Sequence, residues 1–141
     1  MILDDLGLLR GDGSNGHIED TEAGVVDATD RAAVTGQIVL DIKKTGKNGI
    51  PVVVITDTEE AGDRDFQVTI EADDDLNFGT AEVVATFPEF APDDTESKLM
   101  VRRIHTDKRY IRSVITRTTT GTDGWVDALI FVGHQLMNQD A

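Results

Sequence analysis

Short stretches in which apolar and polar residues alternate are the clearest pattern in this chain. Between Asp65 and Glu71, the apolar residues Phe66, Val68 and Ile70 alternate with polar ones. Successive side chains of a strand point to opposite faces of its sheet, so this segment predicts a strand with one buried and one solvated face. The closing segment shows the same pattern, with apolar residues on one face at Val126, Ala128, Ile130 and Val132.

Other strands are predicted from apolar and β-branched composition, which suits a pleated surface. Residues 51–56 form a continuous apolar run, as expected of a strand that is covered on both faces or lies in a sandwich core. The segment 36–43 has apolar residues at every second position, and the Asn48–Gly49 pair that follows is a strong turn signal. Three further segments are predicted to be strands: a weak candidate at 25–28 and firmer candidates at 81–87 and 125–132.

The stretch from Leu99 to Arg117 is predicted to form a basic hairpin, two strands that meet at a polar corner, Thr106–Lys108. Two interpretations of its basic residues stay open: they pair across the two strands with surplus carboxylates, or they contact an acidic or polar partner through bidentate arginine contacts. Six of the thirteen Lys and Arg fall here: Arg102, Arg103, Lys108, Arg109, Arg112 and Arg117. Large apolar and aromatic residues dominate core burial, and on that basis four residues are assigned to the core: Tyr110, Ile111, Val114 and Trp125.

About eight short strands, spaced roughly 10–15 residues apart and without a convincing amphipathic helix, predict an all-β protein. We expect a jelly-roll-like β-sandwich with an extended N-terminal arm. Residues 1–22 are assigned to the arm and a Gly-rich loop, and residues 23–141 to a single sandwich domain. The arm carries large apolar residues that are expected to dock on the chain's own core or on a neighbour: Ile2, Leu3, Leu6, Leu8 and Leu9.

Composition limits the classes of partner. A length of 141 residues suits one domain, and the absence of cysteine excludes disulfides and Cys-ligated metals. The net charge of −14 argues against binding nucleic acid or an anionic membrane through the general surface. No apolar run reaches the ~20 residues that cross a bilayer, and no export signal is evident, so we expect a soluble protein. The acidic excess serves solubility or steers a basic partner.

The residues offer little catalytic chemistry. His17, His105 and His134 lie far apart, outside any spacing typical of metal ligands, and no serine has the context of a hydrolase nucleophile. Asp73–Asp75 with Asn77, or the acidic residues at 57–60, could offer oxygens to Ca²⁺, but the EF-hand pattern is absent. The sequence therefore predicts a protein that is not an enzyme and needs no cofactor.

Four segments, in this order, resemble the cement or decoration proteins on the heads of tailed bacteriophages. The resemblance is spread over nearly the whole chain, and its most telling part is the pairing of the first segment with the third. The segments are Met1–Asp4, Phe66–Phe78, Lys108–Arg112 and Gly124–Ala128.

The resemblance implies a jelly-roll subunit on the outer surface of the phage head, where it would clamp the major capsid protein lattice and associate with copies of itself as a dimer or trimer. Direct contact with nucleic acid or membrane is not expected. The candidate contact residues are the arm anchors Ile2, Leu3 and Leu6 and four arginines: Arg102, Arg103, Arg109 and Arg112. The alternatives are another phage structural part, such as a head–tail connector or tail-tube subunit, and a carbohydrate-binding β-sandwich module. The chain has few aromatic residues, which counts against a carbohydrate-binding module.

Overall fold

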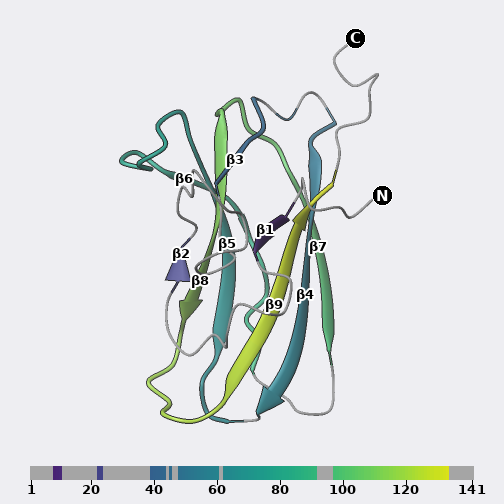
Figure 1. Cartoon of the computed structure of the whole chain (residues 1–141), viewed down its shortest axis with the longest axis vertical. Helices are drawn as coiled ribbons and strands as arrows, with labels where there is room; N and C mark the ends of the chain where they lie inside the picture. The colour runs from purple at the N-terminus through teal and green to yellow at the C-terminus, as the bar shows by residue number, and fades with distance from the viewer. Residues whose placement is uncertain are drawn as a thin grey trace.

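The computed structural model describes residues 8–10, 22–23, 39–43, 45, 48–60, 62–91 and 97–133. This part of the chain forms nine strands in two antiparallel sheets that pack face to face (Figure 1). It contains no helix that could span a membrane. The strands are β1 (Leu8–Arg10), β2 (Glu22–Ala23), β3 (Val39–Asp41), β4 (Ile50–Glu60), β5 (Phe66–Asp73), β6 (Glu82–Thr86), β7 (Lys98–Ile104), β8 (Tyr110–Arg117) and β9 (Trp125–Val132).

The strand order is that of a jelly roll. One sheet runs β1-β9-β4-β7 and the other runs β2-β8-β5-β6, with β3 also paired to β8. β2 and β3 pair with successive parts of β8, Val114–Ile115 and Tyr110–Arg112, on the side away from β5, so together they fill one edge position. The nine strands thus occupy eight positions, ordered 1-8-3-6 and 2-7-4-5, which is the two-sheet arrangement of a jelly roll. The predicted fold class is confirmed.

The core lies between the two sheets and follows the period-two alternation of the strands. Phe66, Val68 and Ile70 on β5 are all 0% exposed, as their alternation predicts. Leu9 on β1 is also 0% exposed and belongs to the same core cluster. Burying one side chain of this size removes it from water at a gain of roughly 1.5–3 kcal/mol. The other central members of the cluster are Val52, Val54, Ile104, Ile111, Ile115, Ala128 and Ile130.

The prediction that Leu99–Arg117 forms a basic hairpin is wrong. β7 pairs with β4 in one sheet, whereas β8 pairs with β5 in the other, so the corner between them crosses from sheet to sheet. This corner is tied to the β3–β4 connection: Thr106 donates its amide to Thr45 Oγ1 (3.0 Å), and the Thr45 hydroxyl donates to the Thr106 carbonyl (3.1 Å). Because a turn and a sheet-to-sheet crossing share the same local polar pattern, the sequence alone did not distinguish them.

Of the four residues assigned to the core, one assignment is confirmed, two are wrong and one lies outside the described side chains. Ile111 is fully buried in the core cluster, which confirms its assignment. Tyr110 and Val114 are only half-buried and alternate with the buried residues of β8, so their assignment was wrong. The side chain of Trp125 lies outside the described residues, as do the predicted strand at 25–28 and the Gly-rich loop.

The loops at one end of the sandwich are joined by backbone-directed hydrogen bonds. The Arg64 guanidinium, in the β4–β5 connection, donates to the carbonyl oxygens of Gly124 (2.8 Å) and Thr122 (2.9 Å) in the β8–β9 connection. The two loops approach so closely that a Cβ at Gly121 would lie 2.2 Å from the Asp63 carbonyl oxygen. These contacts hold the ends of four strands, two from each sheet, in fixed relation.

One buried hydroxyl in the core has no partner among the described residues. Ser113 on β8 is 0% exposed, and its Oγ makes no hydrogen bond to any group that the structure describes. An unsatisfied buried polar group costs about 1–3 kcal/mol. We therefore expect Ser113→Ala to raise the free energy of unfolding by about 1 kcal/mol, measured by urea denaturation.

Thr56→Val is the matched control, because the buried Thr56 hydroxyl accepts the Lys98 amide at 3.1 Å. Losing that acceptor should lower the free energy of unfolding by about 1 kcal/mol. Equal effects of the two substitutions would contradict this account of the core.

Candidate interaction face

The outer faces of the two sheets differ in character. In the sheet containing β5 and β8, the outward positions are mostly polar or charged, as is usual for a solvated sheet face: Gln67, Thr69, Glu71, Arg112 and Thr116. In the other sheet, Val53 and Ile55 on β4 alternate with the core residues Val52 and Val54 and so point outward. The outer face of this second sheet is therefore apolar, unlike the polar face expected of a sheet that is exposed to water.

We define the apolar outer face by the side chains that cross-strand register brings together on β7, β4 and β9. Val53 lies between Val101 and Phe131, and Ile55 lies between Leu99 and Leu129. Residues directly opposite on neighbouring strands share a face, so these form two adjacent apolar rows. The complete set, with the proline at one end, is Pro51, Val53, Ile55, Leu99, Val101, Leu129 and Phe131.

Exposure is concentrated on β7. Leu99 is 69% exposed and Val101 is 56% exposed, whereas Val53 in the middle strand is only 1% exposed. Single exposed apolar residues are ordinary, but a contiguous apolar surface on a sheet is typical of an interaction site. β7 is also the last strand of its sheet, and among the described strands only β4 pairs with it. The edge of β7 that no described strand pairs with therefore adjoins its apolar face.

One of the predicted contact arginines, Arg103, lies at the end of this face, whereas Arg102 is opposite the core residue Val52 in register and lies on the other side of β7. Arg103 is opposite Pro51 in register, and its guanidinium donates to the carbonyl oxygens of Asn48 (2.8 Å) and Gly49 (3.2 Å). Neither Arg103 nor the exposed Arg102 forms an ion pair with a carboxylate among the residues the structure describes.

The other two predicted contact arginines have partners within the chain. Arg109 donates to Asp41 on β3 at 2.8 and 3.0 Å, and this pairing lowers the pKa of Asp41. Arg112 bonds Glu71 on β5 at 2.8 Å and stacks over the buried Phe78 ring, 4.4 Å from its centroid. For these two residues, cross-strand pairing with surplus acids accounts for the charge. They lie in the sheet opposite to that of Arg102 and Arg103.

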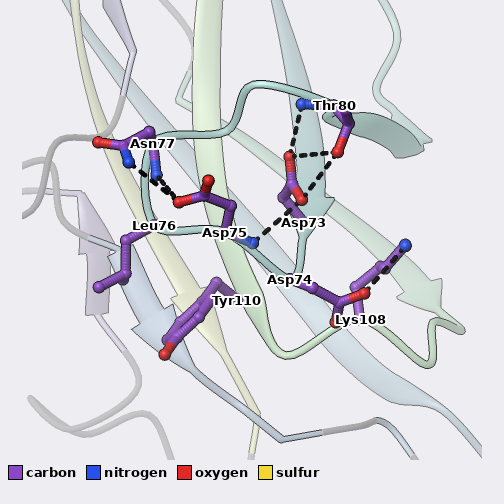
Figure 2. Close-up of a pocket in the computed structure, with 8 residues that line it drawn as sticks. All are labelled: Asp73, Asp74, Asp75, Leu76, Asn77, Thr80, Lys108 and Tyr110. Carbon is purple, nitrogen blue, oxygen red and sulfur yellow. Dashed lines mark hydrogen bonds and ion pairs between the residues drawn. The ribbon is translucent and has the colours of Figure 1, made fainter.

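The acidic turn between β5 and β6 forms an open recess of about 760 Å³ beside β8 (Figure 2). Figure 2 shows the Asp73 carboxylate receiving the amides of Asp75 (3.1 Å) and Thr80 (2.9 Å) and the Thr80 hydroxyl. The Asp75 carboxylate accepts the amide and side-chain nitrogens of Asn77, both at 3.0 Å. These carboxylates are occupied in holding the turn.

Asp74 extends this arrangement to the sheet-crossing corner. Its carboxylate accepts Lys108 Nζ at 3.0 Å and the Arg109 amide at 3.2 Å, and the pairing raises the pKa of Lys108. No cluster of three or more metal-ligating side chains occurs within the described ranges. The turn is accounted for as a structural element.

The predicted site residues therefore fall into three groups. Ile2, Leu3 and Leu6 lie outside the described residues, and their role stays a prediction. Arg103 lies beside the apolar outer face on β7, Arg102 lies on the opposite side of the same strand, and Arg109 and Arg112 lie on β8. Sequence reasoning missed Leu99 and Val101 as surface residues. The apolar run at 51–56 was the sequence signal that could have pointed to them. A strand that is apolar on both faces needs neighbours on both faces, not only in the core.

Comparison with known proteins gives no relative that would assign this chain to a family. No protein-family model matches the chain, and no curated protein matches it. The functional argument therefore rests on the geometry and chemistry of the chain itself.

Asp73 gives a prediction about pH. Its hydrogen bonds, first that from the Asp75 amide, lower its pKa below the ordinary value of 3.8. A group whose pKa is lowered by folding stabilises the protein above its unfolded pKa, and the contribution is lost as the pH falls through the folded pKa. The difference in stability between the native protein and Asp73→Asn should therefore be largest near neutral pH and shrink below about pH 4.

Thermal unfolding of both proteins between about pH 7 and about pH 2.5 measures this difference. The relief of general acidic repulsion at low pH affects both proteins alike and cancels in the comparison. A difference that stayed constant across this range would show that the Asp73 carboxylate does not hold the turn.

Proposed function

We propose that this protein is a phage capsid decoration protein, which binds the outside of the major capsid protein lattice and stabilises the head. Its role is structural, without catalysis or a cofactor, and it acts at the outer surface of the virion. Many copies on the lattice add their contacts, and association with copies of itself as a dimer or trimer strengthens attachment.

The observation that carries the proposal is the apolar outer face on a jelly-roll sandwich. The described polar groups mostly bond to the chain's own backbone and side chains, as in the acidic turn and the Arg64 contacts. The face formed by β7, β4 and β9 differs, because Leu99 and Val101 are exposed there beside Arg103, which forms no ion pair with a described carboxylate. Such a surface favours binding over chemistry.

The edge of β7 that no described strand pairs with supplies a second means of attachment. An extended segment of another protein can add to an open sheet edge, where main-chain hydrogen bonds give affinity and neighbouring side chains give specificity. The N-terminal residues 1–7 remain the candidate arm. β1 begins at Leu8, and Leu9 is buried in the core, so the arm to be tested ends before residue 8.

Co-sedimentation with expanded capsids that lack the protein tests the proposal. We expect saturable binding at a fixed ratio to the major capsid protein, weakened by salt because charge contributes to it. Failure to bind, with the protein closing into rings by itself, would favour a head–tail connector instead.

Two variants assign the contact. Arg102→Glu is expected to weaken shell binding about tenfold, equivalent to about 1.4 kcal/mol. Lys43→Glu, which makes the same charge change at an exposed site beside β3 in the other sheet, should leave binding unchanged. Deletion of residues 2–7 should also weaken binding while preserving the thermal unfolding transition. Equal binding by native protein, Arg102→Glu and the deletion would exclude both contacts.

A further inference from the structure

We propose that the edge of β7 is a strand-addition site whose occupant is an extended segment of a partner protein, apolar at alternate positions and acidic at the end that meets Arg102 and Arg103. In strand addition, an extended segment joins an open sheet edge through main-chain hydrogen bonds. The inference rests on the proposed function for the protein that carries the segment, the major capsid protein. The chemistry of the segment follows from β7 itself.

Among the described edge strands, β7 is the one that is both long and regular (Figure 1). It has seven residues, and its ladder with β4 runs from the pair Ile104–Ile50 to the pair Lys98–Thr56 without a register shift. At the other side of this sheet, β1 has three residues and a register shift. In the second sheet, β6 has five residues and a register shift, and β2 and β3 have two and three residues. Short length and bulges protect sheet edges from pairing, so β7 is the described edge that lacks this protection.

Hydrogen bonds on β4 show which residues of β7 it pairs with. The Pro51 carbonyl accepts the Gly133 amide at 2.8 Å, on the β9 side of β4. Backbone groups of successive strand residues point to opposite sides, so the even-numbered residues of β4 bond β7. Their register partners on β7 are also even-numbered. The Lys98 amide, which donates to Thr56 Oγ1 on β4 at 3.1 Å, points in the same direction.

The odd-numbered residues of β7 therefore direct their amides and carbonyls to the open edge: Leu99, Val101 and Arg103. Their side chains lie on the side of the apolar outer face, where Leu99 is 69% and Val101 is 56% exposed. A residue added opposite each of them shares that face. The fitting occupant has apolar side chains opposite Leu99 and Val101 and a carboxylate opposite Arg103.

Charge selects an acidic occupant. β7 carries Lys98, Arg102 and Arg103 and no carboxylate, in a chain whose net charge is −14. None of these three side chains forms an ion pair with a carboxylate in the part of the chain that the structure describes. An acidic segment is repelled by most of the surface and attracted to this strand, so charge directs it to the β7 edge. β7 of a second copy carries the same positive charges, and like charges on adjacent strands are destabilising.

A synthetic peptide tests the chemistry of the occupant. The probe is Glu-Glu-Val-Thr-Val-Thr, capped at both ends; in antiparallel pairing its glutamates lie opposite Arg103 and Arg102 and its valines opposite Val101 and Leu99. We expect saturable binding to the full chain with a Kd below about 1 mM, measured by NMR titration. Replacing both glutamates by lysine should weaken binding at least about tenfold. Equal binding of the two peptides would overturn the acidic occupant.

Two methylated peptides separate strand addition from a contact between side chains. In the antiparallel pairing, the valine amides face β7 and the amide of the threonine between them points away. N-methylation of both valine amides should abolish binding, whereas N-methylation of that threonine amide should preserve it. If both modified peptides bind alike, the segment does not add as a strand.

Val101→Pro makes the same test in the protein. Proline has no N–H and is tolerated on an edge strand where that group faces away from the neighbouring strand. The variant should keep a cooperative unfolding transition and bind the peptide at least about tenfold more weakly. Val101→Thr, which keeps the amide and the branched shape, is the matched control and should lose much less affinity.

Capsid binding by the same variants separates this inference from the proposed function. If Val101→Pro loses both peptide and capsid binding, while Val101→Thr retains them, the inference is supported. If the native protein and Val101→Pro bind capsids equally, the inference is overturned and the proposed function stands. A native protein that binds the peptide but not capsids keeps the strand-addition site and removes the proposed function. A native protein that does not bind the peptide overturns the acidic, alternating occupant, whatever its capsid binding.

Discussion

Strand β4 has apolar side chains on both of its faces, and each face needs cover. Val52 and Val54 are covered by the opposite sheet, in the core that Phe66, Val68 and Ile70 complete. The outward Val53 is only 1% exposed, whereas Leu99 and Val101 on the neighbouring strand β7 are 69% and 56% exposed. The exposed apolar surface of this sheet therefore lies on β7, next to the strand that is apolar on both faces.

The rest of the sandwich is built so that polar groups satisfy one another. The acidic turn uses Asp73 and Asp75 to hold its own amides, and Asp74 ties the turn to the sheet-crossing corner through Lys108. At the other end, Arg64 joins two loops through carbonyl oxygens. Carboxylates that are engaged in this way hold local structure, so the acidic excess is partly structural and does not by itself mark a ligand site.

Much of the fold could be predicted from local pattern, because alternation fixes which residues of a strand face the core. The segment Phe66–Ile70 and the strand Trp125–Val132 followed from that rule. The pairing of strands could not be predicted in the same way. β7 and β8 are consecutive and carry the same kind of residues, but their partners, β4 and β5, are set by tertiary packing. For the same reason, Tyr110 and Val114 were placed in the core although the alternation of β8 turns them outward.

The candidate site was only partly predictable. Four arginines were selected by type, but whether a guanidinium is free depends on its cross-strand neighbour. Asp41 and Glu71 engage Arg109 and Arg112, whereas no described carboxylate engages Arg102. Leu99 and Val101 were assigned to a strand, but their exposure depends on β7 being the last strand of its sheet. Edge position is a property of the assembled sandwich.

The most direct test of the central claim is carbene footprinting of the protein free and in its assembled state, dimer or decorated capsid. Labelling reports the solvent exposure of individual side chains. The account predicts that labelling of Leu99 and Val101 falls strongly on assembly, while labelling of Val83, which is similarly exposed in the free chain, stays constant. Unchanged labelling of Leu99 and Val101 in the assembled state would show that the apolar outer face is not the interface.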